Sequence, residues 1–463
     1  MDESNTLEEL FATDGGISFG FTVEIPRGEP PPDLEDHPAR YIGDRHILTY
    51  APSGSGKSRR LLLSNILMLP NWSLVIIDIK GELAQQTRLY RQHMADNRVV
   101  MLNPFNVLDM GSDGYNPIAA LQLGPNFIDD AMGLAEAIIR VENERDTHWT
   151  TSAQDLLCAL IMYSRITEDD GGSLGHVRSV LGKPANEFGE EIAKMIEVGI
   201  KQDVEELGIK ASRFLDMNPD NRELHSILST AMTQTRFLDS PPLKEHLSKG
   251  EFDWKSLKER PTTVYINLPA NRLNTHSSYM RIVISDFLQS ILRDSRTPKV
   301  PILIMLDEIA QIGDLPILRN SLALVRSYGC KYWQLWQDSI QHRSVNGPFF
   351  ESAVANSGVL QAFAPQDIST AKLLSERAGQ TTAEIASYSE PVGLPTSRPS
   401  PGNVSVAYAP VPGLLPQELM RMGEGYQVIF SHKTEDFAFA YCPDPSEVAS
   451  LDGILTGGRN SRR

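Results

Sequence analysis

A stretch rich in glycine and serine, residues 51–58 (Ala-Pro-Ser-Gly-Ser-Gly-Lys-Ser), contains the residue types best suited to bind phosphate. It follows a short β-prone run at residues 46–50 and precedes residues 59–69, in which apolar residues recur at helical spacing. This order of strand, glycine-rich turn and helix is the context of a P-loop, whose backbone N–H groups surround a phosphate at the positive end of a helix. The usual pattern begins with glycine. Ala51 stands at that position and is nearly as small, so we expect the turn to form.

The chemistry predicted for this stretch is nucleotide binding. The residues expected to hold the nucleotide are Ser53, Gly54, Ser55, Gly56, Lys57 and Ser58. Lys57 supplies a mobile positive charge for the outer phosphates, which is a catalytic role, and the Ser58 hydroxyl is a ligand for Mg²⁺. The alternative interpretation is a chance loop of small residues before a helix, but the context favours the P-loop.

A second motif lies about 250 residues further along the chain. Residues 300–306 form a hydrophobic run that ends in Asp307 and Glu308, a pattern typical of a Walker B strand. Asp307 is expected to hold Mg²⁺ and its bound water, and Glu308 to orient or deprotonate the attacking water. Either motif alone is a weak signal. Both motifs in this order indicate an enzyme that hydrolyses a nucleoside triphosphate.

Three more side chains are candidates for roles in hydrolysis. Gln337 ends the apolar run of residues 332–336 and is predicted to respond to the γ-phosphate from a neighbouring strand. Arg326 is the candidate for an arginine that reaches the nucleotide of an adjacent subunit, and Arg319 is the second candidate. The alternatives are a satisfied surface amide and ordinary charges on a helix surface.

Asp78 closes another apolar run, residues 73–77. In open α/β sheets the residues that handle ligands lie at the carboxyl ends of the strands, so Asp78 is predicted to lie near the nucleotide. Lys80 and Glu82 are expected near it or at a subunit boundary. A solvated turn is the alternative for these residues.

Composition limits the class of protein. The chain has 463 residues, enough for two or three domains, and its three cysteines form no C-x-x-C pair. No apolar run is long enough for a transmembrane helix, and the acidic N-terminus does not resemble a signal peptide, so we expect a cytoplasmic protein. The formal net charge of −16 argues against a protein that coats DNA but does not exclude a local basic channel.

His148 lies beside acidic residues and could indicate a metal, but a solvated turn between helices is favoured. Trp149 is expected in a core.

Periodicity predicts an α/β fold, with a mainly parallel central sheet flanked by helices and interrupted by an all-helical insertion. The chain is expected to begin with an acidic, proline-rich segment, residues 1–40, and to end with a flexible tail, residues 446–463. Between them, the nucleotide-binding domain comprises residues 41–117 and 253–445, and the helical insertion comprises residues 118–252. A few apolar residues, Phe19, Phe21 and Val23, suggest an edge strand within the first segment. Residues 387–412 are rich in serine, proline and glycine and are predicted to form a mobile loop.

The order of these motifs resembles the coupling ATPases of type IV secretion and bacterial conjugation, over about residues 40–445. The segments that carry the resemblance are residues 46–58, 78–82 (Asp-Ile-Lys-Gly-Glu), 115–117 (Tyr-Asn-Pro), 306–313, 336–341 and 367–379. The resemblance implies a RecA-like P-loop ATPase that uses ATP and Mg²⁺ and works as a homo-hexamer. It implies phosphate and metal binding by Lys57 and Ser58, metal and water binding by Asp307 and Glu308, a coupling role for Gln337, and a finger role for Arg326.

Members of that family usually carry an N-terminal transmembrane hairpin, which this sequence lacks. Three interpretations stay open: a membrane-free relative, a variant from an integrative element, or a protein that reaches the inner membrane through the anchor of a partner. The first hypothesis is a motor that moves single- or double-stranded DNA, with or without a bound relaxase, towards a type IV secretion channel. The second is an ATPase adaptor that receives effector proteins through its helical domain, since acidic helical surfaces suit basic signals. The third is a slow nucleotide switch that pumps nothing, against which the presence of Glu308 and Gln337 argues. A soluble DNA translocase outside secretion is a further alternative.

Overall fold

The computed structural model describes residues 15–24, 26, 38–141, 147–215, 222–250, 252–307, 309–312, 316–389, 403–432 and 436–460. Contacts divide the chain into two units. The first unit comprises Met1–Leu61 and Leu335–Val448, and the second comprises Leu62–Gln334 and Ala449–Arg463. Both units therefore contain segments that are far apart in the sequence.

The first unit is built on a mixed sheet. Its strands follow the order β2-β1-β13-β12-β9-β3, in which β3 and β9 are parallel and the other neighbours are antiparallel. The strands are β1 Ile17–Val23, β2 Pro38–Tyr41, β3 His46–Tyr50, β9 Ser357–Phe363, β12 Tyr426–Ser431 and β13 Phe437–Tyr441. The helices are α15 Ser339–Asn346, α16 Phe350–Ala355, α17 Ile368–Arg377 and α18 Pro416–Leu419. The predicted strand at residues 19–23 is confirmed as part of β1, but its predicted edge position is wrong, because β1 pairs with β2 on one side and with β13 on the other.

The second unit contains a fully parallel sheet in the order β8-β7-β4-β6-β5. Its strands are β4 Ser73–Ile77, β5 Arg98–Leu102, β6 Thr262–Ile266, β7 Ile302–Leu306 and β8 Cys330–Trp336, the last of which ends in the first unit. Every residue of β4, β6 and β7 is buried, which explains why these strands are continuous apolar runs and do not alternate. The predicted strands at residues 73–77 and 302–306 are thus confirmed.

Helices accompany this parallel sheet within the second unit. They are the π-helix η2 Lys57–Leu63, which begins in the first unit, followed by α2 Ser64–Met68, α3 Glu82–Leu89, α11 Ser256–Glu259, α12 Leu273–Arg293, α13 Ile309–Ile312, α14 Pro316–Ser321 and α19 Ala449–Asn460. Helix α19 lies within residues 446–463, where a flexible tail is predicted. Leu451, Ile454 and Leu455 recur at helical spacing, and Leu451 is buried, so apolar packing accounts for the helix.

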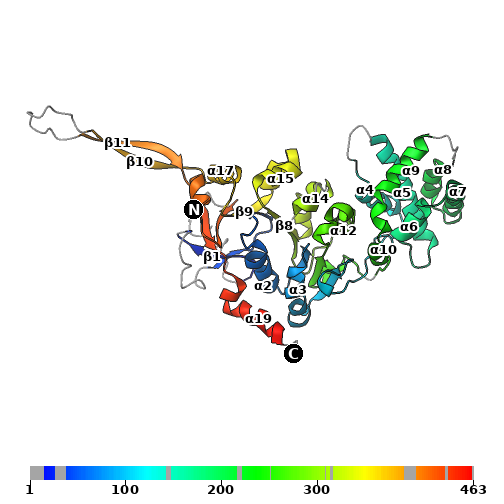
Figure 1. Cartoon of the computed structure of the whole chain (residues 1–463), viewed down its shortest axis with the longest axis horizontal. Coiled ribbons are helices and arrows are strands. Elements are labelled where there is room, and N and C mark those ends of the chain that lie inside the picture. The colour runs from blue at the N-terminus through cyan, green and yellow to red at the C-terminus, as the bar shows by residue number, and fades with distance from the viewer. Residues whose placement is uncertain are drawn as a thin grey trace, which may run out of the picture. The chain divides into compact units, whose positions relative to one another are not determined.

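Between β5 and β6 the chain is helical, as predicted. The helices are α4 Phe127–Ile138, α5 Thr147–Thr167, α6 Leu174–Leu181, α7 Ala185–Lys201, α8 Glu205–Ser212, α9 Arg222–Gln234 and α10 Pro241–His246. They gather into one bundle (Figure 1). Helix α5 is its centre, because twelve of its twenty-one residues are buried.

The prediction of a mobile loop at residues 387–412 is wrong for the half of that stretch that the structure describes. The structure has a two-stranded antiparallel ribbon, β10 Gln380–Ser389 and β11 Asn403–Pro412, drawn as a long hairpin in Figure 1. Residues 390–402, where glycine and proline concentrate, lie outside the described residues. The flanking strands are rich in threonine, valine and tyrosine, which favour extended backbone, and composition averaged over the whole stretch hides that signal.

Candidate functional site

The predicted P-loop connects β3 to the π-helix η2. Ala51 is buried, and its N–H donates to the carbonyl oxygen of Trp336 at 2.8 Å. Gly54 and Gly56 have φ of +81° and +79°, so the turn needs glycine at both positions. Ala51 does not have a positive φ, and for this reason its methyl group is tolerated where the usual pattern has glycine.

The loop has the features of a phosphate cradle. A Cβ built on Gly54 would meet no described atom within 4 Å, so the space beside the loop is open. The hydroxyl of Ser55 is buried, yet it has no hydrogen-bond partner among the residues that the structure describes. A buried hydroxyl without a partner is costly unless a ligand or water satisfies it. An anionic group such as a phosphate fits this need, and Lys57, which is 8% exposed, supplies the opposite charge.

Two arginines fix the helix that follows the loop. Arg59 donates two hydrogen bonds to the carboxylate of Asp444, and Arg60 donates to Glu424 at 3.1 Å and to the carbonyl oxygen of Cys442 at 3.2 Å. Partial burial acts to raise the pKa of Asp444, but the hydrogen bond from Arg59 outweighs it and holds that pKa well below its usual value. The end of the P-loop is therefore tied to the chain that follows β13. No sequence motif had indicated a role for these two arginines.

Gln337 lies directly after the carbonyl group that binds Ala51. Its backbone N–H donates to the side chain of Gln341 at 3.1 Å, and the next residue, Asp338, caps helix α15 by accepting from the N–H of Gln341 at 2.7 Å. Gln337 thus sits between the start of the P-loop and the start of α15. Both contacts lie within the first unit, which brings this predicted residue close to the predicted loop.

In the second unit, acidic residues meet at the carboxyl edge of the parallel sheet. Ile77 of β4 and Leu306 of β7 are register partners, so the residues that follow them, Asp78 and Asp307, are neighbours. Burial raises the pKa of Asp78 to about 6, and the charge of Asp307 adds to the rise. The same carboxylate accepts from the N–H of Ala84 at 2.8 Å, which orients the turn that presents Lys80.

Asn267 is a residue of this edge to which sequence analysis assigned no role. It follows β6, and its Nδ2 donates to the carbonyl oxygen of Asp78 at 2.6 Å. Its Oδ1 is buried without a hydrogen-bond partner among the described residues. A polar residue at the end of an apolar strand is the same signal that identified Asp78 and Asp307, and it could have identified Asn267 too.

The remaining predicted site residues are Glu308, Arg326 and Arg319. Glu308 lies outside the described residues. Arg326 is exposed on the 3₁₀ turn η8 Val325–Tyr328, just before β8, and Arg319 is half-buried on α14. An exposed position such as that of Arg326 suits a side chain that reaches another subunit.

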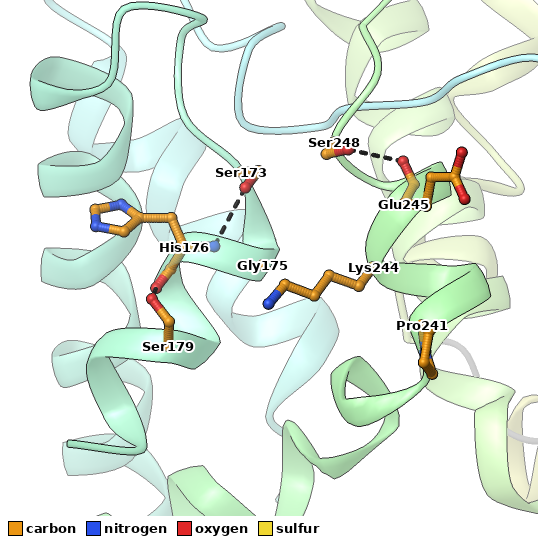
Figure 2. A pocket seen from close by; sticks show the side chains of 8 residues that line it. All are labelled: Ser173, Gly175, His176, Ser179, Pro241, Lys244, Glu245 and Ser248. Carbon is orange, nitrogen blue, oxygen red and sulfur yellow. Dashed lines mark hydrogen bonds between the residues drawn. The ribbon is translucent and has the colours of Figure 1, made fainter.

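The histidine considered as a metal ligand is exposed. His148 Nε2 lies 3.1 Å from Glu223 Oε1, and its ring packs against Trp149, which is half-buried. Within the described part of the chain, no group of three or more histidine, cysteine, aspartate or glutamate residues is arranged to hold a metal ion. A hollow of about 400 Å³ lies elsewhere in the helical insertion, where Lys244 of α10 points towards Gly175 at the start of α6 (Figure 2). Glu245 lines the same hollow, so its charges are mixed.

The loop, the acidic strand ends and the parallel sheet with its helical insertion define the class of protein. It is an α/β, RecA-like P-loop NTPase fold with an inserted helical part. Residues 30–436 match the protein family described as "Type IV secretory system Conjugative DNA transfer". The chain belongs to this family, and the resemblance stated from the motifs is confirmed.

Similar proteins from other bacteria are conjugal transfer and coupling proteins. The chain is 30% identical over 404 residues to the conjugal transfer protein TraG of Escherichia coli, covering 83% of this chain and 62% of that protein. It is 26% identical over 408 residues to the type IV secretion system-coupling protein VirD4 of Bartonella quintana (strain Toulouse), covering 84% and 61%, respectively. The chain therefore spans about three fifths of the length of these relatives.

Solved structures share the fold. The unbound bacterial conjugative coupling protein TrwBdeltaN70 superposes with a TM-score of 0.65 at 17% identity, covering 91% of this chain and 88% of that one. The plasmid coupling protein TrwB in complex with ADP and Mg²⁺ superposes with a TM-score of 0.65 at 16% identity, covering 94% and 96%. At this identity the likeness establishes the fold. Across the residues that the structure describes, we find no helix with the length and apolar character needed to span a membrane.

Proposed function

We propose that this chain is an ATP-driven motor that moves DNA, alone or with a bound relaxase, towards a type IV secretion channel. The observation that carries the proposal is an open P-loop with a buried, unsatisfied Ser55 hydroxyl, in a chain that belongs to the conjugative DNA-transfer family. The related fold of TrwB has been solved with ADPNP and with ADP and Mg²⁺, which supports these ligands for this chain. TrwB has also been solved with the GTP analogue GDPNP, so hydrolysis of ATP has to be compared with hydrolysis of GTP.

The proposed mechanism assigns a role to each predicted site residue. The backbone and side chains of residues 53–58 hold the phosphates, and Lys57 neutralises charge that develops on the outer phosphates. Ser58 and Asp307 hold Mg²⁺, which supplies charge neutralisation at the phosphate oxygens when it is bound. Glu308 orients and deprotonates the attacking water. Gln337 links the state of the nucleotide to helix α15, whose start it adjoins.

The proposal further includes assembly. We infer that the active form is a homo-hexamer in which Arg326, with Arg319 as the alternative, reaches the nucleotide of the neighbouring copy. The chain would act at the cytoplasmic entrance of the channel, held there by a secretion component.

Hydrolysis measurements test the site and the cargo together. We expect ATP hydrolysis that rises on addition of single- or double-stranded DNA, with GTP as the comparison substrate. Lys57→Ala should abolish hydrolysis, and Glu308→Gln should abolish turnover while ATP binding persists, because only the water-activating group is lost. Normal hydrolysis by both variants would contradict the site assignment.

One observation favours a second function, an ATPase adaptor that receives protein effectors. The helical insertion, residues 118–252, has 23 acidic and 13 basic residues and therefore carries ten of the sixteen net negative charges of the chain. Such a surface suits a cationic protein and repels DNA. Hydrolysis that is indifferent to DNA, together with salt-sensitive binding of a cationic effector, would support this function over the motor.

A further inference from the structure

The β10–β11 ribbon forms a sheet of its own. Its ten register pairs run from Gln380↔Pro412 to Ser389↔Asn403 without a bulge. Among the residues that the structure describes, no third strand pairs with it. Its base is anchored to α17, because the N–H of Gly413 donates to the carbonyl oxygen of Gly379 at 2.9 Å and the Ser375 hydroxyl donates to that of Leu414. A two-stranded ribbon alone in water is marginally stable, which points to a further partner.

Two prolines reveal which backbone groups of the ribbon face outwards. Pro412 and Pro410 of β11 are the register partners of Gln380 and Thr382 of β10. Proline has no N–H, so within a strand it occupies positions where the nitrogen faces away from the partner strand. These pairs are therefore the non-hydrogen-bonded pairs of the ladder. Because residues two apart along a strand point the same way, the N–H and C=O groups of β10 at positions 382, 384, 386 and 388 also face outwards.

The two outer edges of the ribbon are consequently different. The edge of β10 offers an uninterrupted series of outward N–H and C=O groups. The edge of β11 offers outward N–H groups at Val404, Val406 and Tyr408, but none at Pro410 and Pro412. Each edge can accept one antiparallel strand, and the β11 edge can do so only beyond its base.

The chemistry of the ribbon indicates a protein strand as its partner. Neither strand contains lysine or arginine, so the ribbon has no charge to bind a phosphate backbone. Its one acidic residue, Glu384, accepts a hydrogen bond from the Tyr408 hydroxyl at 2.9 Å. Tyr408 and Val406 are 71% and 52% exposed. The edge of β10 lacks the lysines, prolines and bulges with which proteins usually protect an exposed edge.

We propose that the occupant is a second copy of this chain, with β10 of one copy pairing antiparallel with β11 of the next. Strands β10 and β11 run in opposite directions within a ribbon. When two ribbons lie side by side, related by a rotation about an axis parallel to their strands, β10 of one copy therefore runs antiparallel to β11 of the other. The ribbons carry almost no charge, and thus copies meet there without the repulsion that the net charge of −16 imposes elsewhere. The contact is head-to-tail, which lets more than two copies join.

This contact does not depend on nucleotide hydrolysis. It goes beyond the proposed function because it names the surface through which copies meet. Loss of nucleotide hydrolysis would leave ribbon pairing intact, and loss of ribbon pairing would leave nucleotide binding at the P-loop intact, so the two ideas can be separated by experiment.

A proline placed on the outward series of β10 tests the pairing. Ala386→Pro removes one outward N–H and, like Pro410 and Pro412, leaves the ladder inside the ribbon intact. We expect it to weaken self-association of the full chain at least about tenfold in sedimentation velocity over a concentration series, the loss of more than one strand hydrogen bond. The matched control Ala386→Ser keeps the N–H and should associate as the unchanged chain does. Unchanged association of Ala386→Pro, or an unchanged chain that stays monomeric, would overturn the proposal.

Cross-linking provides a second test that does not rely on proline. The three native cysteines are buried, so single exposed cysteines can be introduced. Thr382→Cys on β10 and Val406→Cys on β11 are made in separate chains, and a short bis-maleimide is added to each variant and to their mixture. Covalent dimers in the mixture alone support head-to-tail pairing. Dimers of Thr382→Cys by itself, or the absence of dimers throughout, overturn it.

Discussion

Buried polar side chains hold neighbouring segments of this chain together through hydrogen bonds. Arg91 follows α3 and is fully buried, and burial lowers the pKa of its guanidinium to about 10. Among the residues that the structure describes it has no carboxylate partner, and it donates to five oxygens at the end of the P-loop helix and beside β4. These acceptors are the carbonyls of Ile66, Leu69 and Trp72, the side chain of Asn97 and the hydroxyl of Thr263. Arg91 thereby supplies hydrogen bonds to carbonyl groups at the C-terminal end of the helix that begins in the P-loop.

A buried histidine makes the stability of the second unit depend on pH. His246 contacts the Tyr279 hydroxyl through Nε2 at 3.0 Å and the Ser112 hydroxyl through Nδ1 at 3.1 Å. Burial lowers the pKa of His246 from 6.5 to about 4. Below the unfolded pKa the unfolded chain binds a proton that the folded chain does not bind, so stability falls as the pH drops from 6.5 towards 4.

We expect the unfolding free energy to decrease by about 2 kcal/mol from this residue between about pH 7 and about pH 5. His246→Gln retains an amide that can donate and accept but cannot titrate, so its decrease should be smaller by that amount. Urea unfolding of both proteins at the two pH values gives the difference. The other buried histidines, among them His342, whose pKa burial lowers to about 3, are present in both proteins, so their contributions cancel. Equal pH dependence of the two proteins would contradict the buried, neutral state of His246.

At the scale of elements, one carboxylate on α12 binds both connections of the helical insertion. Asp286 on α12 accepts hydrogen bonds from the Tyr115 hydroxyl at 2.6 Å and from Trp254 Nε1 at 3.0 Å. Tyr115 lies on the connection that enters the insertion and Trp254 on the connection that leaves it. Burial raises the pKa of Asp286, because the charged form is disfavoured there, and both hydrogen bonds oppose the rise. The Tyr-Asn-Pro motif therefore has a structural role at the root of the insertion.

Tyr115→Phe should weaken this root. The substitution leaves a buried carboxylate with one donor fewer, and we expect a loss of about 1–3 kcal/mol of unfolding free energy in urea. Tyr163→Phe is the matched control, since the Tyr163 hydroxyl also donates to a carboxylate, that of Glu191, at 3.1 Å. Glu191 keeps its bonds from Lys183 and Lys194, so the control should lose less. A larger loss in the control would refute a special role for Asp286.

The sequence revealed elements whose signal is local and missed features that depend on distant contacts. Apolar runs such as residues 302–306 are recognisable because each side chain is buried on both faces of a parallel sheet. The P-loop is recognisable because its turn requires glycine at positions 54 and 56. By contrast, the pairing of Arg59 with Asp444 joins residues 385 positions apart, and no local pattern encodes it. The β10–β11 ribbon was missed because the glycines and prolines between its strands dominate the composition.

At the scale of the whole molecule, charge is distributed unevenly along the chain. Residues 118–252 carry ten of the sixteen net negative charges, and the remaining residues, which are more than twice as many, carry six. The charge that argued against nucleic acid is thus concentrated in the helical insertion. A field of this sign repels DNA over about one Debye length, roughly 10 Å at 0.1 M salt. DNA that reaches the proposed motor would have to approach through the less acidic remainder.

Neutralising acids on the insertion should therefore strengthen DNA binding at low salt. Asp203, Glu205 and Glu206 are exposed at the start of α8, and changing them to Asn, Gln and Gln removes three negative charges without disturbing buried contacts. Fluorescence anisotropy with a labelled duplex should show about two- to fivefold tighter binding at about 0.05 M salt. The advantage should vanish near 0.5 M, where screening removes long-range repulsion but leaves direct contacts measurable. Weaker binding by the variant, or an advantage that persists at high salt, would mean that these carboxylates act through direct contacts and not through the field of the insertion.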